Sequence, residues 1–193
     1  MKNVNIRKML YIAVFSAILS VSAWISIPSA VPFTLQTLAL FFSFMTVGGL
    51  AGALSSLIYI ALGAVGLPVF SGFGAGLGAI LGAGGGFIIA FPIAGFAYAL
   101  LERLFGKGKS RKLIYTSVSL AVIYAMGSLW FSLVYADGTG FFEALAITVL
   151  PFVIPDVIKM IIAFYASERI GAIITLANND RGRNNGKGKD RQN

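Results

Sequence analysis

The stretch FVIPDVIKMIIAF (residues 152–164) is apolar except for Asp156 and Lys159. A charged side chain at the middle of a membrane helix costs about 2.5–3.5 kcal/mol on insertion scales, so such residues are rare and usually functional. Residues three apart lie on one helix face and can pair, and a carboxylate in a first turn is favoured by the helix dipole. Pro155 fits that first turn, where its missing N–H is harmless. We therefore expect a membrane helix whose ion pair points inward or into a polar cavity; the alternative is a pair that only locks two helices together.

The composition places the whole chain in the same class. Of its 193 residues, 58% are hydrophobic and only 11% are charged, and the mean hydropathy is +0.86, as in a protein with several membrane spans. The absence of cysteine and histidine excludes disulfides, thiol catalysis and the commonest metal ligand and general base. An aspartyl intramembrane protease needs two membrane aspartates, and only Asp156 qualifies. We expect no enzymatic activity, no cofactor and no metal.

The basic residues are clustered rather than spread over a surface. The net charge is +8, and every Lys and Arg except Lys159 falls in residues 2–8, 103–112 or 169–191. Clusters between apolar blocks are typical of cytoplasmic segments. This placement argues for the lipid bilayer as partner and against nucleic acid.

The spacing of the charges predicts the number of spans. Residues 9–101 contain no Asp, Glu, Lys or Arg, and both flanks are basic, so an even number of spans lies between them. The segment is too long for two spans of about 20 residues and suits four. With prolines and glycines as boundaries, the predicted spans are residues 9–27, 34–47, 50–65, 86–105, 113–135 and 155–176. The sequence thus predicts an all-α integral membrane protein with six transmembrane helices and cytoplasmic N- and C-termini. Residues 1–176 form its single domain, and residues 177–193 form a polar, disordered cytoplasmic tail.

The stretch GFGAGLGAILGAGGGF (residues 72–87) is unusually rich in glycine. Gly74, Gly78, Gly82 and Gly86 recur every four residues, which favours a smooth helix face for close packing. Contact with a ligand is an equal alternative, and a third is non-helical backbone that lines a cavity. In the first span, Ala13 and Ala17 form a second small-residue pair, which serves either internal packing or docking of another membrane subunit.

Several segments together resemble one family. They are VPFTLQTLAL (residues 31–40), LGAVGLPVFSGFGAGLG (62–78), LGAGGGF (81–87) and PFVIPDVIKMIIA (151–163). Over residues 7–171 the chain resembles BioY, the biotin-binding S component of energy-coupling factor (ECF) transporters. The resemblance implies six helices in a prokaryotic cell membrane and a ligand pocket near the outer face. It also implies ATP-driven uptake together with a membrane coupling protein and cytoplasmic ATP-binding-cassette ATPases.

The resemblance also implies a binding site. The D-x-x-K pair Asp156 and Lys159 reaches the ligand in the family, and Ala13 and Ala17 match the A-x-x-x-A motif that contacts the coupling protein. A carboxylate can accept from a ureido N–H of biotin, and a lysine can donate to the ureido oxygen or to the tail carboxylate. The other expected site residues lie in the loop after the first helix and in the glycine-rich region: Gln36, Phe70, Phe73, Gly74, Gly85, Gly86 and Phe87.

Two departures from the family leave the ligand open. Many members read GPTGGY where this chain has GAGGGF (residues 82–87), and an asparagine and an arginine that contact the ligand align with Gly74 and Ile88. One alternative is therefore an S component for a different small vitamin or precursor. A structural helix bundle or channel is a further alternative, although one ion pair is a poor substitute for the polar rings of a pore.

Overall fold

The computed structural model describes residues 6–29, 31–135, 138 and 140–189, with side chains as far as Gly171. Its elements in chain order begin with helix α1 (Ile6–Trp24), the hairpin β1 (Ser26–Ile27) and β2 (Phe33–Thr34), α2 (Gln36–Val47) and α3 (Gly49–Ala64). A 3₁₀ turn (Ser71–Phe73), α4 (Gly76–Ile80), α5 (Gly85–Phe105) and α6 (Lys109–Trp130) follow. A π-helical turn (Phe131–Tyr135), α7 (Phe141–Thr148), a 3₁₀ turn (Leu150–Phe152) and α8 (Val153–Lys189) complete the chain.

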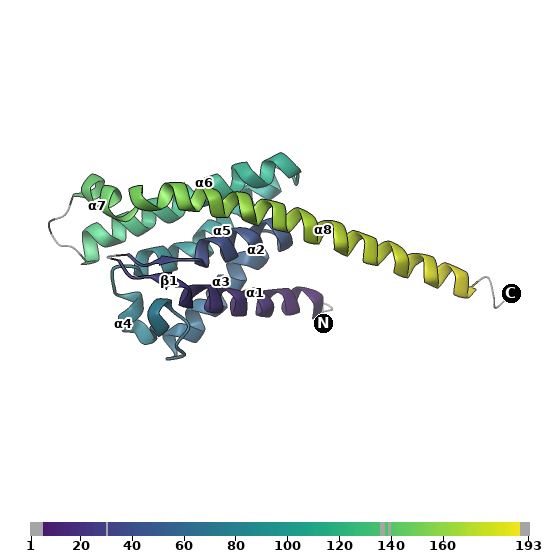
Figure 1. The fold of residues 1–193 in the computed structure, drawn as a ribbon, viewed down its shortest axis with the longest axis horizontal. Helices are drawn as coiled ribbons and strands as arrows, with labels where there is room; N and C mark the ends of the chain where they lie inside the picture. The colour runs from purple at the N-terminus through teal and green to yellow at the C-terminus, as the bar shows by residue number, and fades with distance from the viewer. Residues whose placement is uncertain (1–5, 30, 136–137, 139, 190–193) are drawn as a thin grey trace.

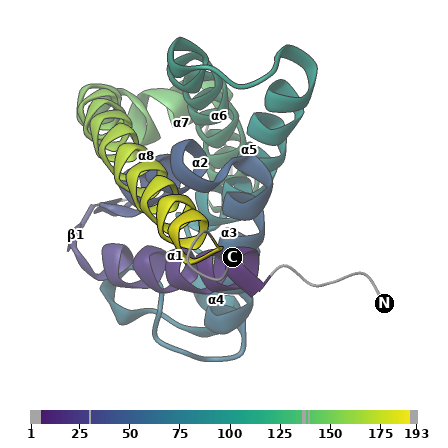
Figure 2. The same ribbon diagram turned by 90° about the vertical axis from the view of Figure 1, so that its right-hand side faces the viewer.

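Helix α2 lies in the middle of the bundle and contacts α1, α3, α5, α6 and α8 (Figure 2). Its side chains Leu40, Phe41 and Phe44 are almost fully buried and form the centre of the core. In a membrane, moving an apolar side chain from lipid to protein gains little hydrophobic free energy. The gain comes from van der Waals packing, so the helices must approach one another closely.

Glycines allow that close approach at the helix contacts. A Cβ atom added to Gly95 of α5 would lie 2.8 Å from the Cβ of Ala53 in α3. One added to Gly86 would lie 2.1 Å from the Cβ of Trp130 in α6. Since real side chains do not tolerate such distances, these positions hold α3, α5 and α6 together only as glycine.

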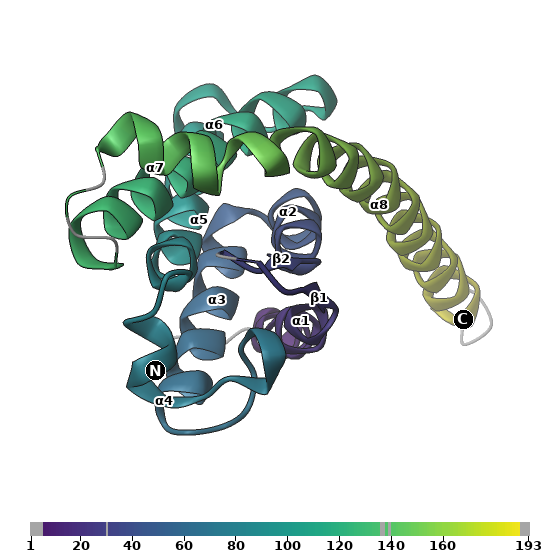
Figure 3. The same ribbon diagram turned by 60° about the vertical axis from the view of Figure 1, so that its left-hand side comes forward.

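The two ends of the bundle differ. At one end lie the start of α1, the turn between α5 and α6 and the long extension of α8; at the other lie the β1–β2 hairpin, α4 and α7 (Figure 1). The strands pair antiparallel, with Ser26 opposite Thr34, and lie beside α1 and α2 (Figure 3). The basic turn between α5 and α6 marks its end as the one predicted to face the cytoplasm.

The expected helices are found, with changed boundaries. Within the described residues, four helical segments are long and apolar enough to span a membrane: Ile6–Trp24, Gly85–Phe105, Lys109–Tyr135 and Phe141–Gly171. Helices α2 and α3 are apolar but shorter, so the count of six spans stays a prediction. Helix α8 continues to Lys189 rather than ending at residue 176, and the division of the chain at that residue also stays a prediction.

The glycine-rich stretch is not one helix face, so the first of its three alternatives is wrong, and the third, non-helical backbone, is found at residues 74–75 and 81–84. Gly74 is extended, Gly78 lies in α4, Gly82 lies in a turn and Gly86 lies in α5. The helix cannot be continuous because φ is positive at Gly72 (64°) and Gly76 (77°), and also at Phe73 (59°). The sequence also did not predict α7 or the hairpin.

Candidate functional site

A cavity of about 330 Å³ opens at the hairpin end of the bundle. This volume falls at the lower end of the ~300–1,000 Å³ usual for small-molecule sites. Five parts of the chain supply its wall: the segment around β2 and the start of α2, the turn after α3, the segment from α4 into α5, the middle of α6 and the start of α8. The cavity therefore lies where segments that are distant in sequence converge.

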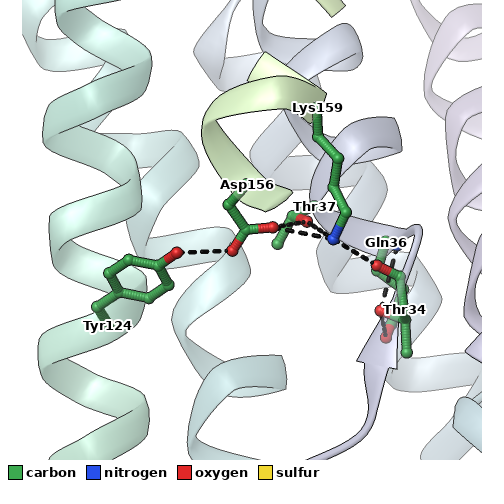
Figure 4. A network of polar contacts seen from close by, with 6 residues as sticks. All are labelled: Thr34, Gln36, Thr37, Tyr124, Asp156 and Lys159. Atoms are coloured by element: carbon green, nitrogen blue, oxygen red, sulfur yellow. Dashed lines mark hydrogen bonds and ion pairs between the residues drawn. The ribbon is translucent and has the colours of Figure 1, made fainter. Parts of the chain in front are cut away.

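Asp156 lies at the centre of the polar part of the cavity wall. The residue is only 3% exposed, and three donors surround its carboxylate (Figure 4). Oδ1 accepts hydrogen bonds from Thr37 Oγ1 (2.8 Å) and Lys159 Nζ (2.9 Å), and Oδ2 accepts one from the hydroxyl of Tyr124 (2.8 Å). A buried carboxylate needs such partners, because an unpaired charge there would be expensive.

Lys159 is equally well satisfied. Besides Asp156, its ammonium donates to the carbonyl oxygen of Thr34 (2.7 Å) and to Thr37 Oγ1 (3.1 Å). It also lies 3.9 Å from the centre of the Phe33 ring, a cation–π distance. An ammonium has three protons to donate, so these contacts use them all. Lys159 thus joins α8 to strand β2 and the start of α2.

The start of α2 is fixed by a second group of hydrogen bonds. Gln36 is buried and donates to the hydroxyl of Tyr59 on α3 (2.6 Å). Thr34 Oγ1 donates to Gln36 Oε1 (2.9 Å) and accepts from the Gln36 backbone N–H (3.2 Å), which satisfies an amide at the helix start. These bonds hold Thr37 in place to meet Asp156.

The arrangement offers acceptors rather than donors. Since a carboxylate oxygen has two lone pairs, Asp156 Oδ2 can accept one more bond beyond that from Tyr124, and the phenol oxygen can also accept. The rest of the described wall is mainly aromatic and aliphatic, with Phe70, Phe87 and Phe91 among its members. Such a cavity suits a small, largely apolar molecule with a polar N–H edge.

Five of the predicted ligand-site residues come together here, and four do not. Gln36, Phe70, Phe87, Asp156 and Lys159 line the cavity.

Phe73, Gly74, Gly85 and Gly86 lie outside the wall. Phe73 is 62% exposed and stacks on Trp24, with ring centres 5.2 Å apart. Gly85 and Gly86 are buried in packing, since added Cβ atoms would meet the backbone of Ile80 and the side chain of Trp130. Of the glycine loop, Gly82, Ala83 and Gly84 line the cavity instead.

Three site residues were not predicted from the sequence: Thr37, Tyr124 and Phe33. Thr37 and Phe33 lie within the quoted segment VPFTLQTLAL, so their neighbourhood was identified but not their roles. Nothing in the sequence distinguishes Tyr124, since a tyrosine in an apolar helix is ordinary and its direction depends on helix rotation.

Ala13 and Ala17 both lie on the exposed face of α1, among the exposed side chains Val14 and Ile18. The buried face of the same helix carries other residues, including Leu19. The alanine pair therefore does not serve packing within this chain, and its face is available to lipid or to another subunit.

Comparison with known proteins agrees with this architecture. The BioY family profile matches residues 1–175. The probable biotin transporter BioY of Pyrococcus horikoshii is 43% identical over 160 residues, which cover 82% of this chain and 93% of the relative. The biotin transporter BioY of Thermotoga maritima is 34% identical over 167 residues, which cover 85% of this chain and 95% of the relative.

The fold also matches a crystal structure, that of the S component for biotin from an ECF-type ABC transporter. The TM-score is 0.78 at 24% sequence identity, over 89% of this chain and 94% of the other. The matched family is one of membrane transporters rather than enzymes, which gives the class of this protein. The chain belongs to the BioY family.

Proposed function

We propose that this chain is the S component for biotin of an ECF-type transporter in a prokaryotic cell membrane. It captures biotin at the outer face, and a separate coupling protein and ATPases supply the energy for uptake. The observation that carries the proposal is the buried network around Asp156 at the wall of a cavity of ligand size. The BioY family membership and the names of the relatives support it.

The hydrogen-bond acceptors in the cavity wall suit the ureido ring of biotin. Asp156 Oδ2 accepts one ureido N–H, and the aromatic side chains Phe70, Phe87 and Phe91 cover the fused rings. A ligand without that N–H leaves the buried carboxylate short of a partner, which supplies selectivity. Lys159 has no unused proton, so a bond to the ureido oxygen or the tail carboxylate requires it to exchange a present partner.

The exposed alanine pair suits the coupling partner. Ala13 and Ala17 leave a shallow strip on α1, where the backbone of another helix can approach closely. This face is distinct from the cavity, so capture of the ligand and docking of the coupling protein involve different residues.

Biotin binding to the purified, detergent-solubilised chain tests the proposal. We expect wild type to bind, and Asp156→Asn and Lys159→Met to bind at least about 30-fold more weakly, as is usual when one partner of a buried charge pair is lost. Lys109→Met is the matched control, because Lys109 is exposed and outside the cavity. Normal binding by folded Asp156→Asn and Lys159→Met proteins would show that the pair is structural.

A different vitamin is the second candidate, favoured by one observation. Ile88 gives the cavity an apolar wall at a position where the family resemblance implies a ligand-contacting arginine in some members. A vitamin panel distinguishes the candidates: if wild type ignores biotin but binds another member of the panel through Asp156, the class stands and the ligand is corrected.

A further inference from the structure

A second cavity, of about 210 Å³, lies at the opposite end of the bundle. The first cavity adjoins Gln36 at the start of α2, and the second adjoins Met45 and Thr46 at its end, so the helix separates them. Twelve helical residues rise about 18 Å. The wall comes from the ends of α2 and α5 and from the start of α6: Met45, Thr46, Gly48, Tyr98, Glu102, Lys107, Gly108, Lys112 and Tyr115.

Two hydroxyl groups at this cavity lack a partner within the described residues. Tyr98 is 1% exposed, and its ring packs against Phe44 (5.4 Å between ring centres) and Tyr115 (5.6 Å), yet no hydrogen bond engages its hydroxyl. Thr46 Oγ1 is buried without a hydrogen-bond partner. Buried polar groups are normally satisfied, so Thr46 Oγ1 indicates a missing polar partner, and the Tyr98 hydroxyl in the same wall can donate to that partner.

The charge around the cavity favours an anion as that partner. Two lysines, Lys107 and Lys112, line the cavity against one carboxylate, that of Glu102. The ammonium of Lys107 is only loosely paired, 3.9 Å from Glu102 Oε1, and its side chain is 78% exposed. Lys112 donates one proton to Glu168 (2.9 Å) and retains others. Gly108 is the N-cap of helix α6 and makes no side-chain capping hydrogen bond, so the positive end of the helix adds to the field.

Glu102 is the one carboxylate in the wall. It accepts a hydrogen bond from the backbone N–H of Gly49 (3.1 Å) in addition to facing Lys107. These contacts neutralise it in part, and the negative charge that remains repels a doubly charged inorganic phosphate more than a singly charged phosphodiester.

We propose that this cavity binds the phosphate of an anionic lipid headgroup at the cytoplasmic face. Basic pockets between membrane helices at this depth suit such headgroups. Exposed apolar side chains on the adjoining segments, Leu50, Phe105 and Ile114, provide a surface for the acyl chains. The site is independent of the ligand cavity and of the proposed function.

Thermal unfolding of the full chain in neutral detergent tests the proposal, with dioctanoyl-phosphatidylglycerol as the probe. We expect saturable stabilisation by this lipid, none by dioctanoylglycerol, which lacks the phosphate, and little by inorganic phosphate at equal concentration. Equal stabilisation by dioctanoylglycerol would overturn the phosphate site. Equal stabilisation by inorganic phosphate would overturn the lipid as its source.

Single substitutions in the cavity wall test whether the lipid binds at this cavity. Tyr98→Phe and Thr46→Val remove one hydroxyl each with little change in shape, and Lys107→Gln removes one charge. Each should weaken the apparent affinity for phosphatidylglycerol about tenfold, as expected for a hydrogen bond or ion contact to a charged group. Arg103→Gln is the matched control for charge, because Arg103 is exposed and does not line the cavity. Equal losses in Arg103→Gln and Lys107→Gln, or none in Tyr98→Phe and Thr46→Val, would show a diffuse surface attraction and overturn the site.

Discussion

At the scale of single residues, the carboxylate of Asp156 is held by donors from three different helices. Thr37 comes from α2, Tyr124 from α6 and Lys159 from the same helix as the aspartate. Such a group is fixed in direction before any ligand arrives, which reduces the entropy that binding has to overcome.

Tyr124→Phe removes one of these donors without removing the ring. We expect biotin to bind about tenfold more weakly, because the carboxylate is no longer fixed in direction and the binding energy must then pay for ordering it. Isothermal titration of the solubilised variant measures the change. Tyr165→Phe is the control, since Tyr165 is 66% exposed and outside the cavity. Binding by Tyr124→Phe as tight as by wild type would remove this hydroxyl from the site.

The sequence could reveal only part of this network. Asp156 and Lys159 were predictable because charges stand out in an apolar helix. Thr37 and Tyr124 were not, because hydroxyl groups are common in membrane helices, and only the rotation of each helix decides which of them face a cavity.

At the scale of elements, the glycines divide into packing positions and loop positions. The period of four residues suggested one packed face, but left-handed backbone at Gly72 and Gly76 breaks the helix between α3 and α5. Periodicity cannot show this, because glycine is compatible both with a helix and with the turn that ends it. The long apolar helices were predictable, since charges, prolines and glycines mark their boundaries.

Gly86→Ala and Gly78→Ala separate the two kinds of position. At Gly86 the new methyl group collides with Trp130, so we expect destabilisation of about 1–3 kcal/mol, as is typical of overpacking. At Gly78, in α4, no atom lies within 4 Å of the added Cβ, and alanine should be neutral or slightly stabilising. Unfolding of both variants in detergent tests this, and equal stability would contradict the packing role of Gly86.

At the scale of the whole molecule, the bundle has one basic end and one end that carries the ligand cavity. The positive-inside rule places the basic turn between α5 and α6 in the cytoplasm, and a single crossing by α6 then places the opposite end of the bundle outside. The absence of cysteine makes this topology easy to test.

Single cysteines at Lys109 and Phe142 should react on opposite sides of the membrane. Phe142 is 84% exposed at the start of α7, and Lys109 is 69% exposed at the start of α6. We expect a membrane-impermeant maleimide to label Phe142→Cys in intact cells and Lys109→Cys only after permeabilisation. Labelling of both positions from the same side would exclude the proposed six-span topology.

Assembly with the coupling protein should depend on the outer face of α1. We expect Ala17→Leu to reduce biotin uptake about tenfold or more in cells that express the whole transporter, because bulk on a small-residue strip keeps helices apart. Binding by the isolated variant should be unchanged. Val14→Leu is the control on the same exposed face. Equal uptake by Ala17→Leu and wild type would place the docking surface elsewhere.

The pairing of Asp156 with Lys159 has an electrical consequence. Asp156 and Lys159 are the only charged side chains among the described residues that line the cavity, and their charges cancel, so the empty site carries no net side-chain charge. Biotin would add its own carboxylate, so the loaded site would carry one negative charge. If transport moves the loaded site inward, an inside-negative potential opposes that step by about 2.3 kcal/mol per 100 mV. The same movement of the empty site would be nearly independent of voltage.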